Sequence, residues 1–296
     1  METPSHKAGF VNIIGNPNVG KSTLMNRLVG ERLSIITAKA QTTRHRIKGI
    51  VNGDDYQIVY SDLPGILTPT YKMQEYMMHF VNESLKDADI ILYIIECGEN
   101  HYNQEIVEKL QQITIPVLLV LNKTDKVAEE VIATTTAYWK NLLPNADTVE
   151  ISALIGHQVN LLLEKIITLL PFSPPFFPKD ELTDRSVRFF ISEIIREKIL
   201  MLYKKEIPYS VEVVVESFKE EEDIVRIGVI LYCERNSQKG IIIGSKGVAI
   251  KQLGIESRVA IEDFLEKHVF LDISVKVLKD WRNQDLQMKR FGYLQN

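Results

Sequence analysis

The chain has 296 residues, of which 45% are hydrophobic and 25% charged, with a formal net charge of -4. This is the composition of a globular protein with an ample core, and the length predicts two domains because a typical domain holds about 100–200 residues. The charge excludes a global positive field for nucleic acid, although the residues from 185 onward hold 19 Lys and Arg against 17 Asp and Glu. The two cysteines do not indicate a disulfide framework and favour a reducing cytoplasm. No apolar run resembles a signal core or approaches the roughly 20 residues that cross a bilayer.

The first part of the chain alternates strand and helix patterns. Short apolar runs predict strands at 10–14, 47–51, 56–60, 90–95, 117–121 and 148–151. Helical spacing predicts helices at 23–29, 73–86, 101–112, 127–142 and 157–170. The sequence Asn-Gly-Asp-Asp at 52–55 is a hairpin signal between two of the strands. This alternation predicts an α/β domain with a mostly parallel sheet, helices on both faces and one antiparallel edge.

Four prolines in residues 171–178 cannot continue a helix or enter a central strand, and they predict a stiff linker. The second part predicts an α+β domain. Its helices are expected at 187–203, around 240–243, from 248 to about 267 and at 283–291, and its strands at 209–218, 224–233 and 270–278. We therefore expect a first domain at 1–172, a linker at 173–184 and a second domain at 185–296.

A phosphate-binding loop follows the first strand. It matches G-x-x-x-x-G-K-[ST] and consists of Gly15, Asn16, Pro17, Asn18, Val19, Gly20, Lys21 and Ser22, with Thr23 next in the helix. The glycines let backbone N–H groups turn toward phosphate oxygens, and the helix N-terminus adds positive potential. We expect Lys21 to reach the β- and γ-phosphates and the Ser22 hydroxyl to bind Mg²⁺.

A second motif follows the third predicted strand and consists of Asp62, Leu63, Pro64 and Gly65. A carboxylate at a strand end can hold Mg²⁺ directly or through water, and the Gly65 N–H can sense the γ-phosphate. The motif is weak alone, but its place after a phosphate-binding loop favours this function.

The base-selecting motif is expected at Asn122, Lys123, Thr124 and Asp125. The Asp125 carboxylate can accept from both N1–H and the 2-amino group of guanine. Adenine offers neither donor, so bound ATP would leave a desolvated acceptor unpaired at a cost of about 1–3 kcal/mol. We expect Asn122 to tie neighbouring loops and the Lys123 stem to pack on the purine. Backbone N–H groups of Ser152, Ala153 and Leu154 are expected near guanine O6.

In this order the motifs resemble the translation-factor-related branch of the GTPase superfamily. Residues 40–46, Ala-Gln-Thr-Thr-Arg-His-Arg, resemble its first switch, in which Thr43 would be the Mg²⁺-binding threonine. Thr42 is the alternative, and spacing alone does not separate them. The expected catalytic residues are Lys21, Thr43 and Gly65.

One position departs from Ras-type enzymes. Ile66 stands where a glutamine orients the attacking water, and its side chain cannot make that hydrogen bond. We therefore predict slow intrinsic turnover. In GTPases with such a replacement, an asparagine at the position of Asn18 can help to hold K⁺ near the phosphates, so K⁺ is a hypothetical second ion.

The second domain carries a GxxG loop formed by Gly244, Ser245, Lys246 and Gly247. Such a loop lets the backbone approach a phosphodiester closely, and KH modules use one to clamp about four nucleotides. The order of elements around it resembles a type II KH domain. Ile241, Ile242, Ile243, Val248 and Ile250 are candidates for lining a base groove. The expected RNA-binding residues outside the loop are Lys239, Ile243, Lys251 and Arg258.

Nearly the whole chain, from about residue 7 to about 294, resembles the Era family of bacterial GTPases. The likeness adds the Pro-rich linker, residues 183–185 and Glu-Ile-Ile-Arg-Glu-Lys at 193–198 to the motifs above. It implies a GTP/GDP switch that uses Mg²⁺, binds the 3′ end of small-subunit rRNA and acts on the pre-30S particle. It also implies a cytoplasmic protein that is partly peripheral to the inner membrane, and we expect a monomer. The alternative is a GTPase whose second domain binds a protein or membrane partner.

Overall fold

The computed structural model describes residues 6–37, 39 and 41–294, and these divide into two compact units. The first comprises the described residues up to Ser34 together with 43–69 and 77–184. The second comprises the described residues from Arg185 onward and also takes in segments 35–42 and 70–76. Ala40, which the sequence places in the first switch, lies outside the described residues.

The sheet of the first unit confirms the expected α/β fold. Its strands are β1 (Lys7–Gly15), β2 (Ile47–Asn52), β3 (Tyr56–Asp62), β4 (Ile90–Glu96), β5 (Val117–Asn122) and β6 (Asp147–Glu150). They lie in the order β2-β3-β1-β4-β5-β6, and among them only β2 runs antiparallel, paired with β3. The carboxyl ends of β1, β3 and β5, which carry the three motifs, therefore meet at one edge.

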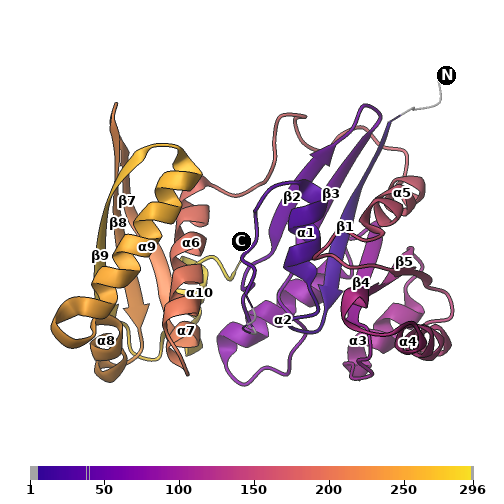
Figure 1. Ribbon diagram of the computed structural model, residues 1–296, viewed down its shortest axis with the longest axis horizontal. Coiled ribbons are helices and arrows are strands. Elements are labelled where there is room, and N and C mark those ends of the chain that lie inside the picture. Colours follow the sequence, from indigo (N-terminus) through magenta and orange to yellow (C-terminus); the bar gives the residue numbers. More distant parts are fainter. Residues whose placement is uncertain (1–5, 38, 40, 295–296) are drawn as a thin grey trace. The chain divides into compact units, whose positions relative to one another are not determined.

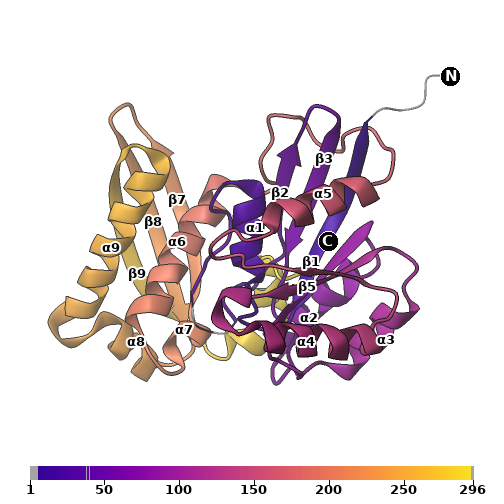
Figure 2. The ribbon, with the colours of Figure 1, turned by 45° about the vertical axis from the view of Figure 1, so that its right-hand side comes forward.

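Five helices surround this sheet (Figures 1 and 2). They are α1 (Lys21–Val29), α2 (Lys72–Ser84), α3 (Gln104–Gln112), α4 (Glu129–Leu142) and α5 (Val159–Leu169). α3 begins later than its pattern predicts because Asn103 caps it, with a side chain that accepts from Ile106 N at 3.1 Å. α4 also begins late, since the short 3₁₀ turn η1 (Thr124–Lys126) precedes it.

The second unit has the expected α+β order. Its elements are α6 (Val187–Leu202), α7 (Ile207–Ser210), β7 (Glu212–Glu220), β8 (Ile224–Cys233), α8 (Asn236–Ile243), η2 (Ser245–Gly247), α9 (Val248–Leu265), β9 (His268–Val277), η3 (Trp281–Asn283) and α10 (Asp285–Arg290). β8 lies between antiparallel β7 and parallel β9. Figure 1 shows α6 and α9 side by side over one face of this sheet, where the apolar core lies.

α7 is an element that the sequence pattern did not predict. The β-branched run suggested a strand from residue 209, but Pro208 stands at the start of a short helical turn and the strand begins only at Glu212. Proline favours a first helical turn because its φ is already helical and it has no N–H to satisfy.

The Pro-rich segment packs on the first unit through one buried glutamine. Gln57 in β3 is fully buried, and its Oε1 accepts from Phe176 N at 2.7 Å and from Phe177 N at 3.0 Å. Its Nε2 donates to Phe177 O at 2.8 Å. The Phe176 ring stacks 4.8 Å from Phe10. Phe176 and Phe177 therefore fasten this segment to the first unit.

Replacing Gln57 with leucine is expected to loosen this segment. The change leaves the two linker amides without an acceptor, so the free energy of unfolding should fall by about 2 kcal/mol. Hydrogen exchange at Phe176 and Phe177 should accelerate. The matched control is Gln104→Leu on an exposed helix, and equal exchange in both variants would contradict the assignment.

Candidate functional site

The phosphate-binding loop turns from β1 into α1. Lys21 is the first residue of α1 and is 6% exposed. Its Nζ donates to the carbonyls of Gly15 at 3.1 Å and Asn16 at 2.8 Å. The ammonium group is thus held inside its own loop, where incoming phosphates would replace backbone carbonyls as partners.

Two glycines let other loops approach the phosphate-binding loop closely. Gly20 has a φ of 101°, and a Cβ there would lie 2.3 Å from Nδ2 of Asn122. A Cβ on Gly65 would lie 2.8 Å from the Pro17 Cα. Both distances are below normal contact, so the packing of the three motifs requires glycine at these positions.

Three oxygen-bearing side chains converge beside Lys21. The Ser22 Oγ donates to the Asp62 Oδ2 at 2.7 Å, and the Thr43 Oγ1 lies 3.0 Å from the Ser22 Oγ and 3.2 Å from the same carboxylate oxygen. Oδ1 of Asp62 is buried and has no hydrogen-bond partner among the described residues. Burial raises the pKa of Asp62, opposed by its hydrogen bond from Ser22 and the charge of Lys21. A set of hard oxygens with an unpaired buried carboxylate oxygen fits Mg²⁺.

The geometry distinguishes the two threonines of the first switch. The hydroxyl of Thr42 donates to Lys39 O at 2.7 Å and pairs with the Thr37 hydroxyl at 3.0 Å. The Thr42 hydroxyl therefore has its hydrogen-bond partners elsewhere than at Asp62, whereas the Thr43 hydroxyl belongs to the oxygen cluster.

Asn122 ties the base-selecting loops to the phosphate-binding loop, as its expected function requires. Its Nδ2 donates to Val19 O at 2.8 Å, and its Oδ1 accepts from Ala153 N at 2.9 Å. The hydroxyl of Thr124 donates to Ile151 O at 3.0 Å, which joins the loop at 122–125 to the loop at 152–154 a second time. Asp125 is exposed, so its carboxylate is accessible to a base.

Lys123 has a partner that the sequence did not indicate. Its Nζ forms an ion pair with Glu96 at the end of β4, and its φ of 65° lies in the left-handed region. Glu96 therefore orients the lysine stem that is expected to pack on the purine.

The structure also brings Arg27 to the loop of Ser152, Ala153 and Leu154, where it donates to the carbonyls of the last two residues. No motif contains this arginine, and only its spacing from Lys21, almost two helical turns later, could have suggested a position near the nucleotide.

Ile66 is 5% exposed, and its N–H donates to Gly15 O at 3.1 Å. The backbone at this position is thus fastened to the phosphate-binding loop, while the side chain presents no polar atom to a water molecule.

The GxxG loop of the second unit has a tight, left-handed backbone, which would let a phosphate approach closely. Gly244, Lys246 and Gly247 have φ values of 72°, 51° and 78°, and the Ser245 and Lys246 side chains are exposed. A left-handed lysine is unusual, and this backbone directs its ammonium group outward from a tight turn.

A cavity of about 350 Å³ lies along β9 and the part of α9 that follows this loop. Its walls combine apolar and basic side chains, namely Ile250, Lys251, Gly254, Ile255, Arg258, Leu271 and Ile273. Of the residues expected to bind RNA, Lys251 and Arg258 line it, whereas Lys239 and Ile243 do not. Ile242, proposed as a groove residue, is 1% exposed and belongs to the core, which corrects that expectation. The strand residues Leu271 and Ile273 were missed because alternation alone does not tell which face of a strand is covered.

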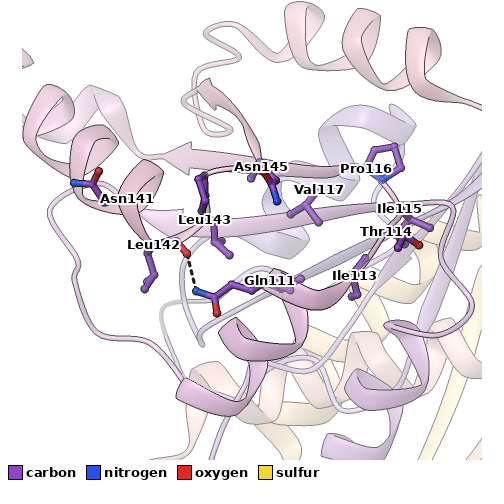
Figure 3. Close-up of a pocket in the computed structure, with 13 residues that line it drawn as sticks. Gln111, Ile113, Thr114, Ile115, Pro116, Val117, Asn141, Leu142, Leu143 and Asn145 are labelled. Atoms are coloured by element: carbon purple, nitrogen blue, oxygen red, sulfur yellow. Dashed lines mark hydrogen bonds between the residues drawn. The ribbon is translucent and has the colours of Figure 1, made fainter.

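A larger cavity of about 680 Å³ lies away from all these residues (Figure 3). It is bordered by the C-terminal ends of α3 and α4 and by the start of β5, and Gln111 closes one side by donating to Leu142 O at 2.8 Å. Because it borders the amino end of β5, it lies at the edge of the sheet opposite to the motifs and contains none of the expected site residues.

Lys39 and Thr42 are anchored within the second unit. Lys39 donates to the carbonyls of Leu200 and Tyr203 at the end of α6, the latter at 2.6 Å. Arg196, buried in α6 and paired with Glu193, donates to Thr42 O. The residue that immediately precedes Thr43 is therefore held by an arginine of the conspicuous Glu-Ile-Ile-Arg-Glu-Lys segment.

Comparisons with known proteins agree with both sites. The model of the family described as "50S ribosome-binding GTPase" matches residues 10–123, and that of the KH domain matches residues 206–282. GTPase Era of Geotalea uraniireducens is 45% identical over 99% of this chain and 100% of its own length. GTPase Era of Syntrophus aciditrophicus is 44% identical over 97% of this chain and 95% of its own.

Two solved structures are similar over 98% of this chain and all of their own. The structure of Era with MgGDPNP and nucleotides 1506–1542 of 16S ribosomal RNA has a TM-score of 0.93 at 36% identity. A point variant of Aquifex aeolicus Era bound to GDP and AlF₄⁻ has a TM-score of 0.92 at 35% identity.

The phosphate-binding loop, the Asn-Lys-x-Asp motif and the GxxG domain together define a GTP-hydrolysing P-loop protein with a KH domain. The full-length relatives narrow this class to one family. The chain belongs to the Era family of GTPases.

Lys21 predicts how nucleotide affinity depends on pH. Burial lowers the pKa of Lys21 from 10.5 to about 8, against the opposing effect of Asp62. Phosphates favour the charged ammonium and raise this pKa, so GDP binding at pH 8 should take up about half a proton, and affinity should fall as the pH rises above 8. Without nucleotide, the folded protein releases the Lys21 proton near pH 8, whereas the unfolded chain keeps it up to about pH 10.5. The free energy of unfolding of the nucleotide-free protein should therefore increase as the pH rises from 8 to 10.5.

Titration calorimetry at pH 8 in HEPES and in Tris measures the proton uptake directly, because the two buffers differ in ionisation enthalpy. Comparison at pH 6.8, where Lys21 is charged in both states, is the internal control. Zero uptake at pH 8 would show that the ammonium is already charged in the empty site.

Proposed function

We propose that this protein is a GTP/GDP switch that binds the 3′ end of 16S rRNA and acts in assembly of the small ribosomal subunit. The observation that carries the proposal is the presence of both sites on one chain that resembles, over 98% of its length, an Era structure with MgGDPNP and 16S rRNA nucleotides 1506–1542. The proposed domain limits are those given by the sequence, 1–172, 173–184 and 185–296.

Guanine selection is assigned to Asp125 and to the loop at 152–154. An exposed carboxylate accepts from N1–H and the 2-amino group, and N–H groups of the loop donate to O6. The two hydrogen bonds of the Asn122 side chain, one to Val19 O and one from Ala153 N, support this assignment because they keep the base end and the phosphate end of the site at a fixed spacing. An unpaired Asp125 beside adenine disfavours ATP.

Hydrolysis is assigned to the residues around Lys21. Ser22, Thr43 and Asp62 would hold Mg²⁺, which would neutralise the charge that develops on the phosphate oxygens. Lys21 would stabilise the same charge, and the Gly65 N–H would donate to the γ-phosphate. The apolar Ile66 leaves the attacking water without a side-chain acceptor, so slow intrinsic turnover is expected.

RNA is assigned to the GxxG loop and the adjoining cavity. Backbone N–H groups and Lys246 contact phosphodiesters, while unstacked bases enter between the apolar walls. Lys251 and Arg258 supply a salt-dependent contribution that does not read sequence. The half-exposed Ile255, at 44%, is apolar surface that a base would cover.

The nucleotide and RNA sites are proposed to be coupled through residues 35–43. GTP and Mg²⁺ would position Thr43, while Arg196 and Lys39 hold the preceding residues to α6. A shift of Thr43 therefore acts on the helix that covers the RNA-binding sheet. By thermodynamic linkage, RNA that favours the GTP state must raise GTP affinity by the same factor.

We also propose a cytoplasmic monomer with peripheral contact to the inner membrane, as the family resemblance implies. Among the helices of the described ranges, none has the length and hydropathy needed to span a bilayer.

The RNA proposal is tested by crosslinking and sequencing of RNA bound to the protein loaded with non-hydrolysable GTP or with GDP. The Lys246→Asp/Ser245→Asp variant places negative charge at the loop and should lose at least about tenfold in affinity. Lys86→Ala, an exposed change in the turn after α2, is the control. Enrichment of the 16S rRNA 3′ end only with GTP and an intact loop is expected. Scattered or nucleotide-independent RNA would favour a protein or membrane partner for the second unit.

The K⁺ hypothesis predicts faster hydrolysis in KCl than in NaCl at equal ionic strength. Asn18, whose φ of 65° shapes the phosphate-binding loop, would contribute a ligand. Asn18→Asp should keep a K⁺ effect, since a carboxylate also binds K⁺, whereas Asn18→Leu should lose it. Equal rates of the unaltered protein in the two salts would count against the ion.

A further inference from the structure

Arg27 holds the base-selecting loop from outside every recognised motif. It lies in the last turn of α1, and its guanidinium donates from Nε to Ala153 O at 2.6 Å and from Nη2 to Leu154 O at 2.5 Å. The two carbonyls belong to consecutive residues, so the planar guanidinium binds them as a pair, which a lysine ammonium cannot do with the same geometry.

These two hydrogen bonds determine the direction of the Leu154 N–H. The carbonyl of Ala153 and the N–H of Leu154 belong to the same peptide unit, which is planar and has its C=O and N–H in opposite directions. Fixing Ala153 O toward Arg27 therefore aims the Leu154 N–H away from it. Because the N–H of Ala153 already donates to Asn122 at 2.9 Å, the Leu154 N–H is the donor of this pair left for a ligand.

The loop is shaped to admit the arginine. Gly156 has a φ of 84°, and a Cβ there would lie 2.8 Å from Nη1 of Arg27. The turn is closed by Gly156 N donating to Ser152 O at 2.8 Å and by Ser152 N donating to His157 O at 3.1 Å. Glycine thus gives the turn its left-handed backbone and leaves space for the guanidinium.

We infer that Arg27 is a positioning residue for base specificity, which acts by directing the Leu154 N–H at an acceptor on C6 of the purine. The inference rests on the proposed placement of guanine O6 at residues 152–154. Lys21 opens α1 and Arg27 lies in its last turn, about 9 Å away along the axis at 1.5 Å per residue. One short helix thereby sets the distance between the phosphate contacts and the base contacts.

The test compares three nucleotides by their Kd values. GDP offers the full set of contacts, 6-thio-GDP replaces O6 by a poorer acceptor, and IDP lacks the 2-amino group that Asp125 is proposed to bind. Arg27→Ala is expected to bind GDP about tenfold more weakly, equivalent to one lost hydrogen bond of about 1.4 kcal/mol. Its preference for GDP over 6-thio-GDP should shrink toward one, while its preference for GDP over IDP should be retained.

Matched variants separate positioning from stability. Arg27→Lys keeps the charge without the paired contact and should lie between the unaltered protein and Arg27→Ala. Gly156→Ala should reproduce the loss of the 6-thio preference through the crowded guanidinium. Lys86→Ala, in the exposed turn after α2, should change none of the three constants.

Two results would overturn the inference. An equal loss of affinity for GDP and 6-thio-GDP, with the preference intact, would make Arg27 a structural support only. An unaltered protein that binds GDP tightly but does not distinguish 6-thio-GDP would show that the loop does not read O6, while leaving GTP binding itself established. Failure of GDP to bind at all would instead contradict the proposed function.

Discussion

The side-chain amide of Asn122 holds the nucleotide site together. It binds the carbonyl of Val19 with one end and the N–H of Ala153 with the other, so two loops from different strands share one rigid group. The close approach is possible because Gly20 has no Cβ to meet the amide. The proposed phosphate contacts at Lys21 and the proposed base contacts at Asp125 and Leu154 would all depend on the spacing that this amide sets.

Two opposite charges, Lys21 and Asp62, lie buried in the same site. Burial disfavours the charged form of each group, so it lowers the pKa of the Lys21 amine and raises that of the Asp62 carboxyl. Neither shift is expected of a site built for stability alone, because buried charges with incomplete partners destabilise a fold. They are expected of a site whose partners arrive with the ligand, namely phosphate oxygens for the amine and a cation for the carboxylate.

The sequence was informative wherever the chemistry depends on the backbone or on one residue type at a fixed spacing. The phosphate-binding loop, the parallel sheet and the order of elements in the second unit followed from such patterns. The identity of the switch threonine did not, because Thr42 and Thr43 are adjacent and chemically alike. Only the position of Asp62 separates them.

Contacts between distant segments were also beyond the sequence. Arg27 and Glu96 carry no motif of their own, and their functions appear only once the loops they touch have been placed. Ile242 illustrates the reverse case. Its neighbours Ile241 and Ile243 have similar side chains, and only the packing of α8 decides that Ile242 points into the core while Ile241 is 52% exposed.

The attachment of the Pro-rich segment has a consequence for how the two units share ligands. Gln57 holds Phe176 and Phe177, Ile50 N donates to Leu182 O, and Thr183 donates to Lys48 O. The chain is thus fastened almost up to Ser186, the cap of α6. A tether this short keeps an RNA bound by one unit at an effective concentration of about millimolar order around the other. Even a weak, transient affinity of the first unit for the same RNA would then raise the overall affinity of the protein for that RNA, without any large interface.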